Sequence, residues 1–391
     1  MLTTTTHFAS SANTSHVNTS QGPHCPPNNE DKYTIYSAVY SLVFVIGLIS
    51  NIGALFVFCR IAKRKNASTV YLMNLAIADL LFGLSLPLRV VYYLKGGDWP
   101  FGDLLCRISG YFFYVSMYCS IFFLTCLSVS RYLSLVHHIK HQRTFTFRRC
   151  VIACISVWLF VLVTTAPFLL NGSQPSDGKI KCFEPVNVIS WTRIMQMNYF
   201  ALVVGFLLPF SVILTCYLLM IRHLVRFDCK SKRVKRDVAM TILVLLVFFI
   251  CFLPYHVQRT VHLHFRVHHR DNCNLENTLR KSVVATLCLA VANSCFDPLL
   301  YIFVGQGFRT FIRTWLKKKE VDPIYTSSSS MVTISLAFIQ RSRELEMSSL
   351  APPRSCQTLI RAEAKGEKDE ASKTENLINV EQNTDIATSI S

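Results

Sequence analysis

The sequence predicts an all-α membrane protein, a bundle of seven transmembrane helices with the N-terminus outside the cell. Hydrophobic residues make up 51% of the 391 residues and charged residues 16%, well below the quarter that is usual in soluble domains. The apolar residues gather in seven segments, each near the roughly 20 residues that cross about 30 Å of hydrocarbon. Basic residues gather in every second connection between these segments.

The seven apolar segments are expected to be helices because a backbone in lipid must satisfy its own hydrogen bonds. The third is the least apolar, with Arg107 at its start and Arg131 near its end. A short amphipathic helix is expected to follow the seventh. We place the seven helices near residues 35–59, 70–94, 106–136, 150–170, 195–221, 238–264 and 282–304.

The charge pattern sets the orientation of the bundle. Lys and Arg dominate the first, third and fifth connections and the stretch after the seventh helix, whereas the other connections carry both signs. An excess of Lys and Arg marks the cytoplasmic side of a membrane protein, so the N-terminus is predicted to be outside. The net charge of +17 is then a result of topology. Nucleic-acid binding, which needs basic residues gathered with aromatics on one solvated face, is not expected.

Outside the cell, residues 1–32 form a segment rich in Ser, Thr and Asn with no cleavable signal peptide. Asn13 and Asn18 in this segment stand in glycosylation sequons, as does Asn171 in the second outer connection. The predicted transmembrane domain, residues 33–304, follows. We therefore expect a glycosylated N-terminal segment.

Inside the cell, two segments follow the seventh helix. Residues 305–319 have apolar side chains at spacings of three and four with basic ones opposite, which predicts an amphipathic helix on the inner membrane surface. Residues 320–391 are rich in Ser, Thr, Glu and Lys, which is typical of a disordered cytoplasmic tail.

Two carboxylates lie near the middle of predicted membrane helices, where polar groups are costly and therefore candidates for function. Asp79 lies in NLAIADLL of the second helix and Asp297 in FDPLLY of the seventh. Two such charges at similar depth repel each other unless a proton or a small cation lies between them. Ser120, Asn293 and Ser294 are the expected neighbours. A hydrogen-bonded packing network without a cation is the alternative.

Two arginines lie in the outer halves of predicted helices. Arg89 is ten residues beyond Asp79, about 15 Å further out, and Arg259 lies near the outer end of the sixth helix. No Asp or Glu lies in the outer halves of the helices that carry them. A ligand carboxylate or phosphate would supply the missing counter-charge. Snorkelling to lipid headgroups is the alternative, and it is the preferred interpretation for His262 and His264.

Tyrosines at comparable depth would line the same pocket, where they would cover apolar ligand surface and donate hydrogen bonds. Tyr111, Tyr114 and Tyr118 recur at spacings of three and four in the third helix, and Tyr40 lies in the first. Tyr255 shares a helical face with Arg259, four residues away.

Four of the 15 cysteines lie in polar surroundings and are disulfide candidates: Cys25, Cys106, Cys182 and Cys273. A Cys106–Cys182 bridge would pin the second outer connection over the bundle, and a Cys25–Cys273 bridge would tie the N-terminal segment to the last one. The oxidising exterior permits both, although four cysteines allow three pairings. The cysteines inside apolar segments are expected to be small buried hydrophobes.

The chain resembles rhodopsin-like G-protein-coupled receptors over about residues 33–318. The resemblance rests on NLAIADLL, an arginine that ends the third helix, Trp158 in the fourth, Pro209 in the fifth, FLP in the sixth and DPLLY in the seventh. Within this family, PLRVVYY, FGDLLCR, YVSMYCSIFFLT, KCFEP and HVQRTVHLHF closely resemble the type 1 cysteinyl leukotriene receptors.

The resemblance implies a plasma-membrane receptor that binds a cysteinyl leukotriene and couples through a heterotrimeric G protein to phospholipase C and calcium. The ligand contacts that it and the pocket argument imply are Tyr40, Arg89, Tyr114, Tyr118, Asn198, Tyr255, Arg259 and Arg280. It implies a sodium-linked network of Asp79, Ser120, Asn293 and Asp297. No cofactor is expected apart from an allosteric sodium ion at Asp79.

At the inner end, the resemblance implies that Arg131, with Tyr217 and Tyr301, meets the G protein, and that arrestin and a receptor kinase act at the tail. The chain departs from the family at residues 130–132, where SRY replaces the usual DRY. The acidic neighbour that restrains Arg131 is therefore absent, which predicts higher basal activity. Phe252 replaces the Trp that is common in the sixth helix.

Three other functions compete with this reading. A receptor for another anionic ligand, a nucleotide or a lysophospholipid, would satisfy the arginines equally well. A transporter or channel is disfavoured because the chain has no internal repeat and no paired broken helices. An enzyme is not expected because no nucleophile–base pair or metal cluster occurs at a suitable spacing.

Overall fold

The computed structural model describes residues 30–60, 67–137, 144–170, 172–176, 178–183, 188–227, 232–268 and 273–304. The predicted glycosylation sites Asn13, Asn18 and Asn171, together with Cys25, lie outside these residues. The amphipathic helix and the tail predicted beyond residue 304 also lie outside them and stay predictions.

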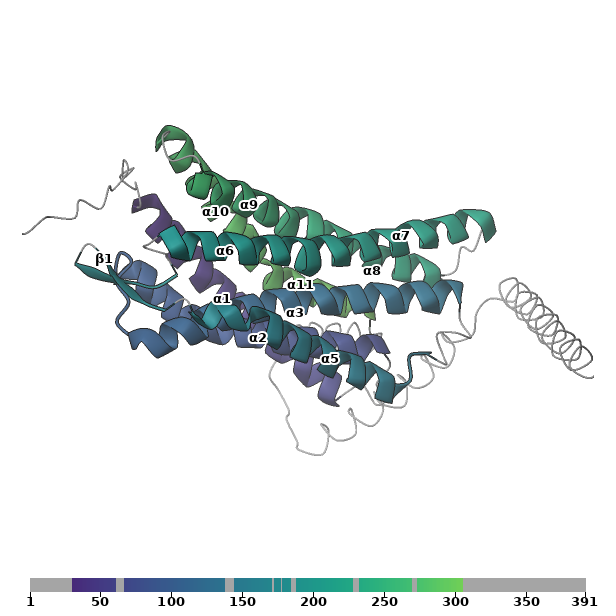
Figure 1. The fold of residues 1–391 in the computed structure, drawn as a ribbon. Helices are drawn as coiled ribbons and strands as arrows, with labels where there is room; N and C mark the ends of the chain where they lie inside the picture. Colours follow the sequence, from purple (N-terminus) through teal and green to yellow (C-terminus); the bar gives the residue numbers. More distant parts are fainter. Residues whose placement is uncertain are drawn as a thin grey trace, which may run out of the picture.

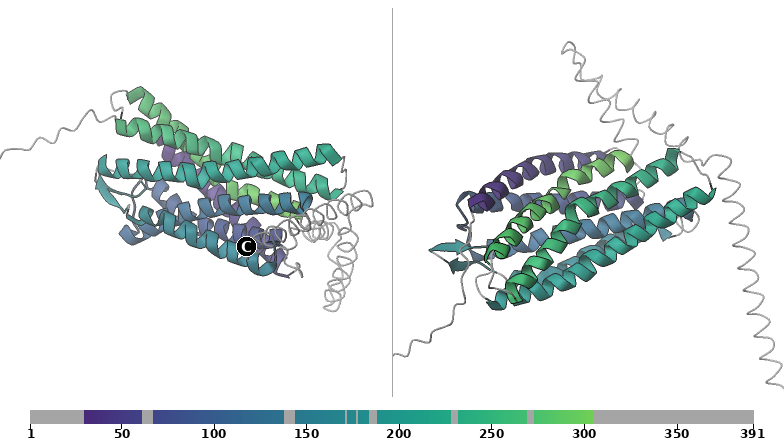
Figure 2. Two further views of the ribbon diagram at one scale, coloured as in Figure 1. Left: turned by 45° about the vertical axis from the view of Figure 1, so that its right-hand side comes forward. Right: turned by 90° about the horizontal axis from the view of Figure 1, so that it is seen from above.

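Seven helical spans in the described residues are long and apolar enough to cross a membrane, as the sequence predicts. They run side by side in one bundle (Figures 1 and 2). Several begin before the predicted position because polar residues prolong them beyond the apolar core. The spans are Lys32–Cys59, Ala67–Leu94, Gly102–Val136, Phe147–Leu170, Trp191–Arg226, Val234–His268 and Asn274–Tyr301.

The first three spans are single helices, and the fourth ends in a 3-10 turn. They are α1 (Glu30–Arg60), α2 (Ala67–Leu94), α3 (Gly102–Val136), α5 (Phe147–Thr165) and η1 (Ala166–Leu170). Helix α3 runs through the bundle between α2, α5 and α7, and its middle, including Cys119, Ile121 and Leu124, is fully buried. A residue on α3 can therefore touch several other spans, which suits a helix that carries site residues.

The fifth and sixth spans each contain a π-helical segment, which the sequence analysis did not predict. The fifth comprises α6 (Val188–Phe200), η2 (Ala201–Leu207) and α7 (Leu208–Phe227), and the sixth α8 (Lys232–Val247), η3 (Phe248–Phe252) and α9 (Leu253–His268). Pro209 follows one segment and Pro254 the other. Proline has no N–H and its ring clashes with the carbonyl four residues before it, so a wider turn relieves the clash.

The seventh span comprises α10 (Cys273–Val291) and α11 (Asn293–Val304), with Ala292 between them. A hairpin that the sequence analysis did not predict lies at one end of the bundle (Figure 1). Its strands β1 (Gln174–Ser176) and β2 (Lys179–Lys181) are antiparallel, with Pro175 opposite Ile180. Gly178, at φ 70°, makes the turn.

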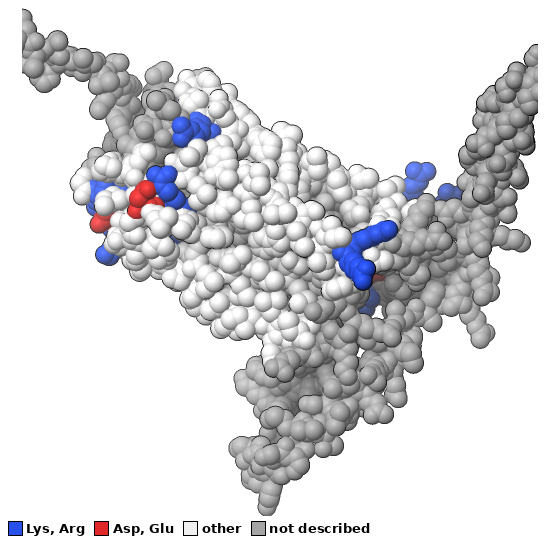
Figure 3. Space-filling view, turned by 60° about the horizontal axis from the view of Figure 1, so that its bottom comes forward, with Lys and Arg blue, Asp and Glu red and all other residues white. Residues whose placement is uncertain are grey.

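The outward surface of the bundle is apolar along its middle. Leu42, Leu84 and Val163 are 61%, 66% and 71% exposed, which suits contact with lipid chains. On the face shown in Figure 3, Lys, Arg, Asp and Glu of the described residues lie only toward the two ends. The membrane therefore surrounds the middle of the bundle, and the two ends carry the polar chemistry.

Candidate functional site

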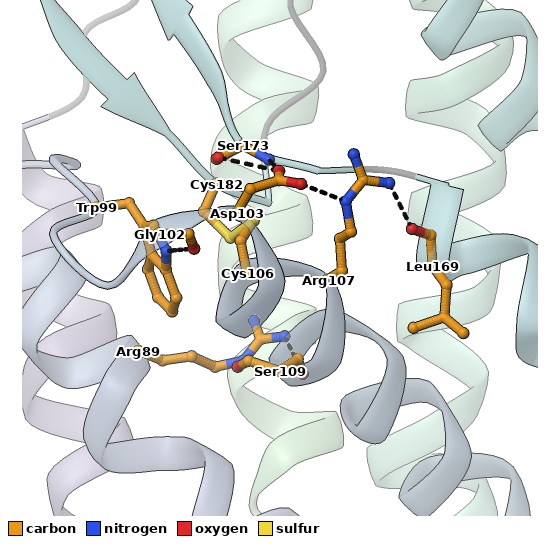
Figure 4. The surroundings of a disulfide bond; sticks show 10 residues. All are labelled: Arg89, Trp99, Gly102, Asp103, Cys106, Arg107, Ser109, Leu169, Ser173 and Cys182. Atoms are coloured by element: carbon orange, nitrogen blue, oxygen red, sulfur yellow. Dashed lines mark hydrogen bonds and ion pairs between the residues drawn. A yellow bond between two sulfur atoms is a disulfide. The ribbon is translucent and has the colours of Figure 1, made fainter.

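A disulfide fixes the hairpin to the outer end of α3. Cys106 of α3 bonds Cys182, directly after β2, with Cα atoms 5.8 Å apart, which confirms one of the two suggested bridges. Figure 4 shows the hairpin drawn over the top of α3 at this bond. The suggested Cys25–Cys273 bridge stays a prediction, since Cys25 is outside the described residues.

Hydrogen bonds around the disulfide hold the hairpin at further points (Figure 4). Asp103 accepts one from Arg107 Nε at 2.5 Å and one from Ser173 N at 2.7 Å. Arg107 also donates to the Leu169 carbonyl at 2.7 Å. On the other side, Trp99 N donates to the Ile180 carbonyl at 2.8 Å. The hairpin is therefore a fixed cover over the outer end of the bundle.

Arg89 of α2 lies beneath this cover, as predicted for a pocket residue. Its guanidinium lies 4.5 Å from the ring centre of Phe113 and 3.9 Å from that of Phe183. Arg89 is 5% exposed. Its guanidinium donates a hydrogen bond of 3.4 Å to the Ser109 carbonyl. Its Nε has no hydrogen-bond partner among the described residues. Phe183, which the sequence analysis missed, is placed there by the adjacent disulfide and its φ of 61°.

Arg259 of α9 is the second pocket arginine. It donates from Nε to Asn198 Oδ1 at 3.0 Å and from Nη1 to the Tyr255 hydroxyl at 2.7 Å, and it lies 5.2 Å from the ring centre of Tyr114. Asn198 is oriented by its own bond to Thr260 Oγ1 at 2.8 Å. In the described residues, neither Arg89 nor Arg259 forms an ion pair with an Asp or Glu.

Aromatic side chains surround the two arginines. Tyr40 is fully buried and its hydroxyl has no hydrogen-bond partner among the described residues. Tyr114 stacks on Phe168 at 3.8 Å, and Tyr118 lies 6.1 Å from the ring of His256. The structure thus brings together Tyr40, Arg89, Tyr114, Tyr118, Asn198, Tyr255 and Arg259 on the outer side of the bundle. Tyr111 is the exception, since its hydroxyl donates to the Leu162 carbonyl of α5 at 2.9 Å.

The structure also gives the surroundings of three further residues at the outer end: His262, His264 and Arg280. His262 was expected at the lipid headgroups, but it is buried, with Trp191 of α6 at 6.2 Å between ring centres. His264 accepts or donates a 2.9 Å hydrogen bond with Tyr199. Arg280 is bonded to Glu276 at 2.7 Å, so it differs from Arg89 and Arg259 in having a carboxylate partner.

A small cavity, lined by polar and apolar side chains, lies in the middle of the bundle. Its volume is about 20 Å³, enough for one water molecule or a small cation. Asp79, Ser120 and Asn293 line it, and Asn293 Nδ2 donates to Asp297 Oδ2 at 2.9 Å. Asp79 Oδ2, Asn293 Oδ1 and Asp297 Oδ1 have no hydrogen-bond partner among the described residues. Oxygen atoms of this kind are the donors that hard cations prefer, so the residues fit a sodium ion.

At the inner end, Arg131 of α3 forms an ion pair with Asp237 of α8 at 3.0 Å. Both residues are buried, at 8% and 1% exposure. The acidic neighbour is absent from residue 130, as the sequence shows, but an acid from another helix pairs with Arg131 in its place. The expected higher basal activity stays a prediction. The sequence held one signal for this acid, a single Asp at the end of the basic run KRVKRD.

The two tyrosines predicted near Arg131 have different surroundings. Tyr301 of α11 is fully buried and donates to Asn51 Oδ1 of α1 at 2.9 Å. Asn51 in turn donates to the Ser294 carbonyl at 3.2 Å. Tyr217 of α7 is half-buried beside the main core. Tyr301 therefore links the seventh span to the first.

Comparisons with known proteins give the family. The family model described as 7 transmembrane receptor (rhodopsin family) matches residues 50–301. The chain belongs to the rhodopsin family of seven-transmembrane receptors. It is a multi-pass plasma membrane protein and a receptor rather than an enzyme, with a ligand and a G protein as its partners.

Relatives within the family narrow the comparison. Cysteinyl leukotriene receptor 1 of Sus scrofa is 42% identical over 289 residues, which cover 72% of this chain and 84% of the relative. Cysteinyl leukotriene receptor 2 of Sus scrofa is 41% identical, covering 73% and 83%. Lysophosphatidic acid receptor 6 of Mus musculus is 38% identical, covering 75% and 87%. The relatives therefore share the bundle with this chain but have names that specify different lipid ligands.

Proposed function

We propose that this receptor binds cysteinyl leukotrienes and signals through its G protein to phospholipase C and calcium. The observation that carries the proposal is a pair of arginines, Arg89 and Arg259, that lie among aromatic side chains without an acidic partner among the described residues. Relatives that include two types of cysteinyl leukotriene receptor support it.

The chemistry of the cavity suits a lipid with acidic groups. A guanidinium pairs with a carboxylate through two parallel hydrogen bonds, and this pair is stronger where water is excluded. Arg89 is sandwiched between Phe113 and Phe183, so its plane is held in place before a ligand arrives. Pre-organised groups lose little conformational entropy on binding.

Each contact has a separate role in the proposed complex. Arg89 and Arg259 bind carboxylates of the ligand, and Asn198 holds Arg259 in position through its 3.0 Å bond. Tyr40, whose buried hydroxyl has no described hydrogen-bond partner, donates to the peptide headgroup. Tyr114 and Tyr118 cover the fatty chain.

A calcium assay in transfected cells tests the ligand. Cells that express the receptor are exposed to cysteinyl leukotrienes, nucleotides and lysophosphatidic acid, with surface expression measured in parallel. We expect responses to the leukotrienes at nanomolar to low micromolar concentrations and loss of these responses when phospholipase C is inhibited. A response to nucleotides alone would overturn the proposal.

A lysophospholipid is the second candidate, favoured by one observation. Lysophosphatidic acid receptor 6 of Mus musculus is 38% identical to the chain, nearly as similar as the leukotriene receptors. A phosphate would satisfy Arg89 and Arg259 as a carboxylate does. In the same assay, a response to lysophosphatidic acid without one to leukotrienes would select this candidate.

A further inference from the structure

A buried carboxylate lies at the outer ends of α9 and α10. Glu276 of α10 is 3% exposed. It pairs with Arg280, one turn along the same helix, at 2.7 Å, and with Arg266 of α9. Arg266 also lies 5.1 Å from the ring centre of Trp191 on α6. We call Arg266, Glu276 and Arg280 the outer clasp. It connects the fifth, sixth and seventh spans.

The outer clasp and the ligand cavity are neighbours. On α9, His262 lies one turn from Arg259 and one turn from Arg266, and Trp191 lies 6.2 Å from the ring of His262 and 5.1 Å from the guanidinium of Arg266. Arg259 belongs to the cavity and Arg266 belongs to the clasp. Arg259 and Arg266 therefore lie two turns apart on α9, and Glu276 is the carboxylate, among the described residues, that pairs with Arg266 and Arg280.

The two sets of arginines present different electrostatics to a ligand. Arg259 has neutral partners, Asn198 and Tyr255, so an acidic group of a ligand gains the full attraction of its charge. Arg280 already shares its charge with Glu276. A ligand acid that approaches Arg280 meets the negative charge of Glu276 as well, and like charges side by side at an interface are unfavourable.

We propose that Glu276 is a specificity-determining residue of this receptor. It neutralises part of the charge of Arg266 and Arg280, so that the cavity binds acidic groups at Arg89 and Arg259 and disfavours a further negative charge at its mouth. A repulsive element of this kind sets selectivity by weakening the binding of the wrong ligand. The inference rests on the anion-binding cavity of the proposed function.

The test compares two ligands that differ by one charge. Competition binding against a labelled cysteinyl leukotriene, on membranes, gives the affinities of a cysteinyl leukotriene and of an analogue that carries one further carboxylate in its peptide headgroup. In Glu276→Gln, we expect the ratio of these affinities to shift about tenfold toward the analogue with the further carboxylate, because the amide keeps the size of the side chain and removes its charge. An unchanged ratio would overturn the proposal.

A second variant traces the effect to its source. Adding Arg280→Gln to Glu276→Gln removes the cation that the first change exposes, so the ratio should return toward the wild-type value. Arg280→Gln alone should change the ratio much less, because Arg280 is already paired. A shift that persists in the double variant would assign the effect to Arg266, and one that persists after Arg266→Gln is added as well would contradict the proposal.

Asp103→Asn is the matched control. Asp103 also pairs with an arginine four residues along its helix, Arg107, but this pair is exposed. The same acid-to-amide change there also weakens the contact with Ser173 that holds the hairpin, so both affinities should fall together and their ratio should stay unchanged. An equal shift in the ratio would mean that any outer acid has this effect. If leukotrienes do not bind the wild type at all, the proposed ligand is wrong. Lysophosphatidic acid and its phosphate methyl ester then test the clasp by the same ratio.

Discussion

Arg259 at the outer end of the bundle and Arg131 at the inner end are the same side chain in opposite electrostatic settings. Arg259 is held by an amide, a phenol and an aromatic face. Arg131 is paired at 3.0 Å with a carboxylate, Asp237, which is 1% exposed. The difference indicates two functions of a cation in a membrane protein. Arg259 can bind an anionic ligand, whereas Arg131 holds two helices together.

The physical consequence differs at each end. A guanidinium without a counter-charge in a water-poor cavity gains much from an anionic ligand, because the surrounding groups screen it weakly. A buried ion pair is already neutral, and removing one partner leaves a charge that costs several kcal/mol to keep buried. We therefore expect changes at Arg259 to affect ligand affinity and changes at Asp237 to affect the balance of receptor states.

The largest effect is expected at the outer end. Arg259→Gln removes the charge that binds the ligand acid, and a hydrogen bond to a charged group contributes about 1.5 to 3 kcal/mol, roughly 10- to 150-fold in affinity. Agonist competition binding measures the loss, with basal signalling unchanged. Arg259→Lys keeps the charge but loses the two-pronged geometry, so its affinity should lie between those of the wild type and Arg259→Gln. Equal affinity in all three would show that Arg259 does not bind the ligand.

At the inner end, Asp237→Asn should raise signalling without ligand. The ion pair joins α3 to α8. Its loss should shift the equilibrium by about 1 to 2 kcal/mol toward any state in which these helices are apart, which corresponds to roughly fivefold or more in basal activity. Basal inositol phosphate accumulation at equal surface expression measures this change. Agonist affinity should change little or rise slightly. Unchanged basal activity would mean that the pair does not restrain the receptor.

The comparison also shows what the sequence could predict. Apolar length and charge bias predicted seven spans and their orientation because both follow from the solvent rather than from packing. Arg89 and Arg259 were found because an arginine in the outer half of a membrane helix, with no acid in that half, is conspicuous. Asp237 was missed because it is 106 residues from Arg131, and one sequence does not show which helices meet.

Details of the cover and of the helix irregularities also needed the structure. Phe183 reaches Arg89 because the predicted disulfide and an unusual backbone angle place it there, and the letters KCFEP show neither the angle nor the contact. Helix α3 carries three tyrosines at spacings of three and four, yet Tyr111 bonds to α5. Three tyrosines at this spacing cover a wider face of α3 than the face that lies toward Arg89 and Arg259, so one of them contacts a neighbouring helix instead.

The cavity at Asp79 lies between the two ends and tests whether they communicate. In the wild type, agonist affinity should fall several-fold when sodium chloride replaces the salt of a large organic cation. Asp79→Asn removes a charged oxygen from the candidate sodium site, so agonist affinity in this variant should not depend on sodium. Competition binding at constant ionic strength measures this dependence. Sodium sensitivity that persists in the variant would mean that the ion does not bind at Asp79.

The smallest expected effect separates the shape of the outer cavity from its charge. A Cβ added at Gly205 would lie 2.7 Å from Tyr118 Cε1, so Gly205→Ala must move the tyrosine ring. We expect agonist affinity to fall about threefold to tenfold, since a displaced ring costs about 1 kcal/mol of packing. Gly83→Ala is the control, because its Cβ would have no neighbour within 4 Å, and its affinity should match the wild type.

Basal activity should stay constant in both Gly205→Ala and Gly83→Ala, since neither change touches Arg131 or Asp237. A rise in basal activity in Gly205→Ala alone would show that the two ends are coupled through Tyr118. The functions of Arg259 and Arg131 would then not be independent.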